Sequence, residues 1–508
     1  MAADGSSAMP AAGGARVGAG VLAATCVSTL VVNANTSAVS ILLPAISADV
    51  GTSTETLQWA VTGYSLVGAA VIVTGGVLGD IAGRRTVFVG ALLLFIASCA
   101  LIALSDSGAG VIAGRAIQGA AGSTLLACGM SLLSVAATGP AQMRAVSIWG
   151  AASAVGAAAG PLVGGALVDT TGWQGLFWID AGIAALCIPL TLRTVPESRD
   201  PARPKSIDVA GMLLVAGTLV PFVLALSKGT DWGWGSLATL GCFAIAIACG
   251  FGFVAVERRV RAPLLDLELL RNRMLVGATL AILIGAGTIN GLMYVVSLYF
   301  QDPAGLDMSP LQAGLATLPA TVGLIVVTPF VSSLATRIGS RQVIGLGFAI
   351  TTVGFAALVF LTGSWAYGAF VLPLIAIAVG MGFSNGCASS ISTASVPTHQ
   401  VGSASGVSNM ARYVGAALVT AAAATIYGSA AASADAASRT DALVDGVARS
   451  ALLMTIASAL GIALALLAGR HRPDRARTVD RAAAAAAAVH TVPTPHAAGD
   501  ERAVPAAG

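Results

Sequence analysis

The sequence predicts an all-α integral membrane protein of about fourteen transmembrane helices. Of its 508 residues, 56% are hydrophobic and only 10% are charged, whereas soluble chains carry about 25% charged residues. The apolar residues form long continuous runs, without the alternation that the strands of a membrane barrel need. Lys and Arg residues gather in every second loop between these runs. Together the three observations exclude an ordinary water-soluble protein.

Each run is long enough for a helix to cross a bilayer, which takes about 20 apolar residues for about 30 Å of hydrocarbon. In chain order, the spans are expected at residues 19–46, 58–79, 86–104, 109–136, 145–168, 174–192, 208–226, 236–256, 274–300, 310–334, 342–361, 367–393, 403–426 and 449–468. The flanking residues 1–18 and 469–508 are expected to be disordered cytoplasmic termini, because Ala, Gly, Pro and Arg dominate them.

The charged loops set the orientation of these spans. If the N-terminus lies in the cytoplasm, 21 of the 26 Lys and Arg residues fall on the cytoplasmic side, as positively charged loops do in membrane proteins. The outer side holds Lys228, Arg439 and Arg449, while Arg115 and Arg412 lie inside spans. A missed span would move every later loop to the other side. We therefore expect a multi-pass protein of the inner (plasma) membrane with both termini cytoplasmic.

Composition also limits the chemistry. The seven cysteines lie in apolar runs without a Cys-x-x-Cys pair, and the four histidines lie in loops or in the tail. Disulfides, metal sites and other cofactors are therefore not expected. A net charge of +3 with scattered basic residues excludes a nucleic-acid partner. Neither lysine, Lys205 or Lys228, stands in a phosphate-binding loop, which excludes ATP as the direct energy source.

Two similar loops indicate an internal repeat. Leu78–Arg85, after the span 58–79, aligns with Leu334–Arg341, after the span 310–334. Corresponding loops predict corresponding halves. The halves are expected at residues 19–192 and 274–468, with six helices each, and residues 193–273 hold the linkers and two extra helices.

Four short motifs stand at the expected spans. They are Trp59-x-x-Thr62-Gly63-Tyr64, Gly76-x-Leu78-x-Asp80-x-x-Gly83-Arg84-Arg85, Arg115-x-x-Gln118-Gly119 and Gly156-x-x-x-Gly160-Pro161-x-x-Gly164-Gly165. With these motifs, over about residues 20–468, the chain resembles the major facilitator superfamily, and within it the fourteen-helix drug:proton antiporters of the EmrB/QacA type. The resemblance implies a major-facilitator-type fold of two six-helix halves with two inserted helices.

The resemblance also implies a function. We expect a secondary active exporter of amphipathic small molecules, coupled to protons and working by alternating access as a monomer in the lipid bilayer. A proton-coupled importer or exporter of one specific metabolite stays open as the alternative. A membrane enzyme or sensor is disfavoured, because the sequence shows neither a nucleophile, base and acid at membrane depth nor a soluble output domain.

The loop motif has a physical interpretation. Gly76 and Gly83 permit close helix approach and a tight turn, while Arg84 and Arg85 anchor to anionic headgroups. The resemblance implies that Asp80 braces one half against the start of the helix near 401–406, where a helix N-terminus attracts an anion. Alternatively the arginines only set the topology. Ile81 replaces an arginine that is common in the family, which predicts a weaker brace.

Two arginines fall inside spans. A guanidinium at membrane depth costs about 2.5–3.5 kcal/mol on insertion scales, so Arg115 is expected to face the bundle interior and to hold a nearby acid. A structural arginine satisfied by backbone carbonyls is the alternative. Arg412, in Asn409-x-x-Arg412-x-x-Gly415, serves either packing or substrate contact.

The Gly-Pro run of the span 145–168 is called the antiporter motif in this family. Gly156, Gly160 and Gly164 expose backbone along one stripe, and Pro161 removes a backbone donor. A generic packing face would look similar, but the Gly-Pro step followed by Gly164 and Gly165 favours an exchanger.

The titrating residue is the least certain part of the pattern. Asn35 stands where many relatives have an aspartate, and an amide carries no titratable proton. Asp180 is the carboxylate that remains within a span, and burial favours the protonated form that a proton carrier needs. We hypothesise that it takes over part of this role; an acid that reaches the outer interface through water is the alternative. Three amides, Asn290, Asn385 and Asn409, either line a cavity or pack helices together.

Overall fold

The computed structural model describes residues 18–136, 139–199, 208–260, 263–265, 267–396, 401–432 and 438–467, and these ranges contain helices and no β-strand. In chain order the elements are α1 (Ala19–Val50), α2 (Thr54–Ala82), α3 (Arg84–Ala103), α4 (Gly108–Ala136), α5 (Gly139–Thr171), α6 (Gln174–Thr194), α7 (Val209–Trp232), α8 (Leu237–Glu257), the 3-10 helix η1 (Leu269–Arg271), α9 (Arg273–Gln301), α10 (Pro310–Ala316), α11 (Leu318–Ile338), α12 (Ser340–Val359), α13 (Tyr367–Ala394), α14 (Val401–Ala432) and α15 (Arg439–Leu467). The all-α prediction is confirmed.

The helices are long enough for a multi-pass membrane protein. Over the described residues, thirteen of them have the length and apolar character needed to cross a bilayer. The predicted termini 1–18 and 469–508 lie outside the described residues, apart from Gly18.

One predicted span is interrupted. Residues 310–334 were expected to form one helix, but α10 and α11 meet at Thr317, whose backbone lies between them. Pro319 stands at the start of α11, and its ring lacks the N–H and clashes with the carbonyl oxygen four residues earlier. Ser309 and Gln312 form a capping box that begins α10. The prediction of a single continuous helix was wrong at this point.

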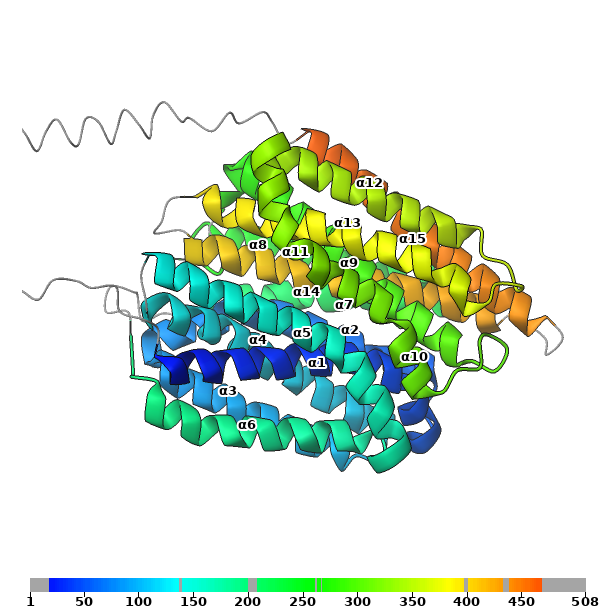
Figure 1. The fold of residues 1–508 in the computed structure, drawn as a ribbon, viewed down its shortest axis with the longest axis horizontal. Coiled ribbons are helices and arrows are strands. Elements are labelled where there is room, and N and C mark those ends of the chain that lie inside the picture. The colour runs from blue at the N-terminus through cyan, green and yellow to red at the C-terminus, as the bar shows by residue number, and fades with distance from the viewer. Residues whose placement is uncertain are drawn as a thin grey trace, which may run out of the picture. The chain divides into compact units, whose positions relative to one another are not determined.

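Helices pair within each of the two predicted halves. In the first, α1 packs along α5, α2 along α4, and α3 against both α4 and α6 (Figure 1). In the second, α9 packs along α14, while α12 packs against α13 and α15. The division into halves at 19–192 and 274–468 agrees with this pairing and stays a prediction.

Two hydrogen bonds join the two sets at the end of the bundle where α1 finishes and α2 begins. The Ser297 hydroxyl of α9 donates to the Ser40 carbonyl oxygen of α1 at 2.7 Å. Gln301 Nε2 donates to the Ile41 carbonyl oxygen at 3.1 Å. Helix α2 also packs along α14, and α5 packs against α10 and α11.

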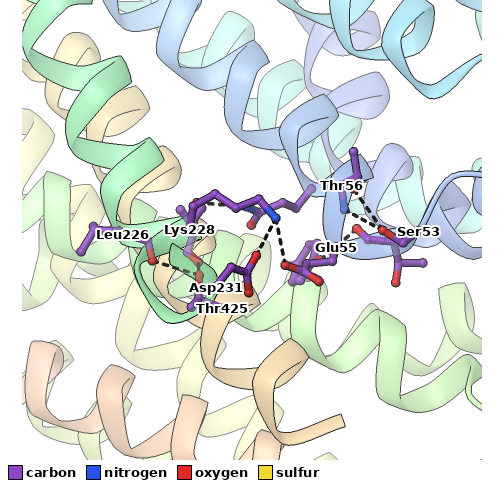
Figure 2. A network of polar contacts seen from close by, with 12 residues as sticks. Ser53, Glu55, Thr56, Leu226, Lys228, Asp231 and Thr425 are labelled. Carbon is purple, nitrogen blue, oxygen red and sulfur yellow. Dashed lines mark hydrogen bonds and ion pairs between the residues drawn. The ribbon is translucent and has the colours of Figure 1, made fainter. Parts of the chain in front are cut away.

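Of the two inserted helices, α7 attaches to both sets. Helix α7 packs on α8, α2 and α14. Figure 2 shows Lys228 of α7 between two carboxylates, with its Nζ atom 3.5 Å from Glu55 of α2 and 2.8 Å from Asp231. In the same view, the Thr425 hydroxyl of α14 donates to the Leu226 carbonyl oxygen at 3.4 Å. Helix α7 therefore joins one helix from each predicted half.

Candidate functional site

Arg115 of α4 is the largest fully buried side chain of the site, with 0% exposure. Its Nε atom donates to the Ala60 carbonyl oxygen of α2 at 3.1 Å. Its Nη1 atom donates to the side-chain oxygens of Asn35 and Gln118. The guanidinium also lies over the Tyr64 ring, 4.4 Å from the ring centroid, a favourable cation–π arrangement. Helices α1, α2 and α4 thus share one buried cation.

Asn35 links this cation to a carboxylate. The amide oxygen accepts from Arg115, and Nδ2 donates to Asp180 Oδ2 of α6 at 2.7 Å. Asp180 is only 4% exposed. A primary amide has an acceptor at one atom and donors at the other, so Asn35 can join a positive group to a negative one. The chain Arg115–Asn35–Asp180 brings together three residues that the sequence had singled out separately.

The contacts of Arg115 fit both roles that the sequence left open, a structural arginine and an arginine that holds a nearby acid. A backbone carbonyl satisfies Nε, as a structural arginine requires, while the amide of Asn35 leads to the acid. Its Nη2 atom is buried and has no hydrogen-bond partner among the described residues. A buried donor without an acceptor costs about 1–3 kcal/mol, and more when charged. Arg115 therefore keeps one buried donor that its contacts with the described residues do not use.

The glycine stripe of α5 lies directly on α1. At Gly156 and Gly160 an added Cβ atom would overlap backbone carbonyl oxygens of α1, and at Gly164 it would lie 3.0 Å from a methyl group. The atoms met are Leu30 O, Ala34 O and Ala38 Cβ, in that order. Only glycine permits so close an approach of the two backbones.

The end of the same motif contacts the other predicted half. A Cβ atom at Gly165 would overlap the Pro310 carbonyl oxygen of α10. In return, a Cβ atom at Gly314 of α10 would overlap the Pro161 carbonyl oxygen. The motif therefore serves two contacts, one with α1 along its length and one with α10 at its end. The sequence had not predicted the second.

The loop motif forms a tight turn between α2 and α3. Gly83 has φ +118°, a region that side chains avoid. Asp80 accepts from Arg84 Nε at 2.9 Å, and Arg84 Nη2 lies 2.8 Å from the same carboxylate oxygen. Gly76 packs beside α4, where an added Cβ atom would lie 3.7 Å from Ala127. The brace of Asp80 on 401–406 stays a prediction, because the side chains of 401–403 lie outside the described residues.

Glu197, which the sequence analysis did not single out, covers the start of α3. It accepts hydrogen bonds from the backbone N–H groups of Arg85 at 3.1 Å and Thr86 at 3.2 Å. The Thr86 hydroxyl donates to it as well, and Arg85 Nε lies 3.8 Å away. The residue before α3 is Gly83, which has no side chain to cap the helix. That missing cap was a signal in the sequence, but nothing near it pointed to Glu197, which lies 112 positions after Arg85.

Arg412 stands apart from the buried chain. It lies on α14, is exposed, and has Nη2 3.5 Å from the Ser389 hydroxyl of α13. Its neighbour Tyr413 packs against Tyr64, with the ring centroids 6.3 Å apart. Tyr64 therefore contacts Arg115 on one side and α14 on the other. The structure connects the two arginines through aromatic rings and not through a shared hydrogen bond among the described residues.

The three amides are placed differently. Asn290 and Asn409 donate to carbonyl oxygens four residues earlier in their own helices, at 2.8 and 3.0 Å. Asn385 lies against Gly285 of α9, where an added Cβ atom would be 2.9 Å from its side-chain oxygen. These contacts stabilise the helices themselves and leave a role in a cavity as a prediction.

Comparison with known proteins gives consistent matches. The sequence pattern described as Major Facilitator Superfamily matches residues 25–420. The tetracenomycin C resistance and export protein of Streptomyces glaucescens is 31% identical over 402 residues, which cover 79% of this chain and 74% of that protein. The multidrug efflux pump LfrA of Mycolicibacterium smegmatis is 31% identical over 407 residues, 80% of each chain. An auto-inhibited POT family peptide transporter has a similar fold, with a TM-score of 0.61 and 15% identity over 89% of this chain and 96% of that one.

Proposed function

The chain belongs to the major facilitator superfamily, and on that premise we propose that it is a secondary active exporter of amphipathic small molecules, driven by proton antiport. Relatives with 31% identity are named as export and efflux proteins, which supports export over import. The superfamily consists of transporters, and we propose no catalytic activity for this chain. The transport unit is one chain in the inner (plasma) membrane, with both termini in the cytoplasm, as the Lys and Arg distribution favours.

The observation that carries the proposal is the buried chain Arg115–Asn35–Asp180. In the family pattern the acid is on the first helix; here the carboxylate lies one hydrogen bond further, on α6. Ionised Asp180 accepts from the Asn35 amide and so holds its oxygen toward Arg115. A protonated carboxyl group loses the negative charge and gains an O–H donor beside its remaining acceptor oxygen, which weakens this orientation. Arg115 rests on Tyr64, and Tyr64 packs against Tyr413 of the other half, so the change reaches the contact between the halves.

The contacts between the halves support alternating access. In the proposed orientation, the bonds from α9 to α1 and the backbone contact of α5 with α10 lie toward the outer side. In this orientation, the described conformation is closed on the outer side of the membrane. Export requires these contacts to separate and to form again in each cycle, because a carrier exposes its central site to one side at a time.

One proton supplies enough free energy for modest export. Moving one charge across about 100 mV is worth about 2.3 kcal/mol, and about 1.4 kcal/mol corresponds to a tenfold concentration ratio. A single proton thus supports accumulation ratios of tens, which is sufficient against slow passive return of an apolar drug.

The test uses everted membrane vesicles, energised by respiration, with ethidium as the probe. The wild-type chain should take up ethidium into the vesicles and release protons from them. Asp180→Asn should abolish both gradient-driven uptake and ethidium-induced proton release while ethidium still binds. Asp169→Asn, at an exposed carboxylate near the end of α5, is the matched control and should behave as wild type.

A gain-of-function variant sharpens the test. Asn35→Asp restores the acid of the family pattern, so the double variant Asn35→Asp/Asp180→Asn should recover part of the coupling. Unchanged proton release in Asp180→Asn would contradict the role of Asp180. Energy-dependent uptake of ethidium into intact cells, and not into everted vesicles, would contradict export and favour an importer.

A further inference from the structure

Arg412 is a cation that faces solvent inside the helix bundle. It lies well within the candidate span Ala404–Ala432. Between Ala404 and Gly428 it is the one exposed residue of α14, and all others are buried or half-buried. Helix α14 is enclosed because it packs on α2, α7, α9, α13 and α15. An exposed residue on such a helix faces an internal, water-accessible space and not the lipid, where a guanidinium is costly.

No carboxylate of the described residues lies within ion-pair distance of Arg412. The sequence from residue 274 to 432 contains only two acids, Asp302 and Asp307, both in the segment between α9 and α10. Asp302 is already paired with Arg439 at 2.8 Å. Asp180 is linked to Arg115 by two hydrogen bonds through Asn35. The interior of the bundle therefore keeps one positive charge that the chain does not balance.

The neighbours of Arg412 suit the polar end of a ligand. Its contact with the Ser389 hydroxyl is long, at 3.5 Å, and an anion in that place would bind more tightly. One turn earlier on α13, the Asn385 side-chain oxygen is buried without a hydrogen-bond partner. Side-chain O and N positions of an amide are interchangeable by rotation, so Asn385 can offer a donor. Asn409 lies one turn before Arg412 on α14, with Nδ2 bound to its own helix.

Aromatic surface adjoins this polar group. Tyr413 follows Arg412 directly, and its ring lies against Gly68 of α2, where an added Cβ atom would be 2.8 Å away. The buried Tyr64 ring packs against Tyr413. A guanidinium beside aromatic rings matches a ligand with an acidic group on a ring or alkyl body.

We propose that Arg412 binds the acidic group of amphipathic organic anions, which form one class of the exported substrates. The inference rests on the proposed export function and names a class of its substrates. Ser389 and Asn385 assist at the acidic group, and Tyr413 contacts the apolar body. Export of an anion from a cell that is negative inside also moves charge down the membrane potential, so the potential adds to the driving force.

The experiment compares two probes that differ in charge alone, dansyl-phenylalanine and its carboxamide. Everted vesicles with wild-type chain should take up the carboxylate about tenfold faster than the carboxamide. Arg412→Gln should remove this difference by slowing only the carboxylate, and Arg412→Lys should retain part of it. Ethidium uptake is measured in the same vesicles as a reference for the export function.

Every outcome of this transport experiment either supports or contradicts the proposed role of Arg412. An equal loss for both probes in Arg412→Gln would make Arg412 a packing residue, and equal or faster transport of the carboxamide by wild type would also overturn the proposal. Export of ethidium without export of the carboxylate would contradict the substrate class alone, whereas no energy-dependent transport of any probe would contradict the proposed function and the substrate class with it. If Arg412→Gln does not fold, thermal stabilisation of the wild-type protein by the carboxylate and not by the carboxamide provides the decision.

Discussion

Glu197 is a single side chain that caps a helix from a distant part of the chain. Helix α3 begins after a glycine, so its first N–H groups depend on Glu197. Partial burial raises the pKa of Glu197, but the hydrogen bonds from Thr86, Ser198 and Arg85 outweigh it, so the net pKa lies below its ordinary value of 4.5. The positive end of the helix favours the same ionised form. Glu197 is thus bound more tightly as an anion than as an acid.

We predict that Glu197→Gln lowers the stability of the protein at pH 7 and not at low pH. Because the folded-state pKa is depressed, the stabilisation by the carboxylate is present above the unfolded value of about 4.5 and is lost as pH falls through the folded value. Melting temperatures of purified wild type and variant should therefore differ at pH 7 and converge as the pH falls below 4.5 through the lowered folded-state pKa of Glu197. The control is Asp106→Asn in the exposed loop after α3. A difference in melting temperature that does not change with pH would contradict an electrostatic role of Glu197 at the start of α3.

The residues of the buried chain were found in the sequence, but their contacts were not. Arg115 and Asp180 stand out because charges at membrane depth are costly. Asn35 and Asp180 are 145 positions apart, and Glu197 lies 112 positions after Arg85. Such pairings depend on how helices pack, and a single sequence carries no pattern for them. Tyr64, quoted within a motif, gained its role only from its place between Arg115 and Tyr413.

At the scale of the elements, the contact of α5 with α1 depends on the absence of side chains. We predict that Gly160→Ala destabilises the protein by about 1–3 kcal/mol, the usual cost of overpacking, because its Cβ atom would overlap the Ala34 carbonyl oxygen. Gly150→Ala, earlier on the same helix with nothing within 4 Å of the added atom, is the matched control. Thermal unfolding in detergent gives both values. Equal stability of the two variants would mean that α5 and α1 are further apart than described.

The break between α10 and α11 shows what an apolar run conceals. Residues 310–334 contain Pro310 and Pro319, and Ser309 with Gln312 has the pattern of a capping box. These are local signals for helix starts, but hydropathy favours one span because the residues between are apolar. The short helix α10 makes its contact with a distant part of the chain, because Gly314 packs against the Pro161 carbonyl oxygen of α5. The sequence predicts both partners as helical and cannot predict that they meet.

At the scale of the whole molecule, the two predicted halves meet along α2 and α14, and three further connections join them toward the side that we propose to be outer. They are the bonds of α9 to α1, the backbone contact of α10 with α5, and the attachment of α7 to α2 and α14. The first two lie directly between the halves. The third runs through an inserted helix and includes an exposed ion pair, which contributes little to stability. An alternating cycle must break the first two, while α7 can follow the halves as they move.

Joining α1 to α9 should therefore stop transport. The Ser297 hydroxyl lies 2.7 Å from the Ser40 carbonyl oxygen, so cysteines at both positions are within reach of a short bis-methanethiosulfonate reagent, which attaches to each cysteine through a reducible disulfide bond. We predict that the crosslinked Ser40→Cys/Ser297→Cys protein loses energy-dependent ethidium export, because the outward opening is blocked, and that reduction restores it. Ser297→Cys alone, treated in the same way, controls for reaction at the seven native cysteines. Full export by the crosslinked protein would show that this contact persists through the cycle, and the closed outer side could not then be one of two alternating states.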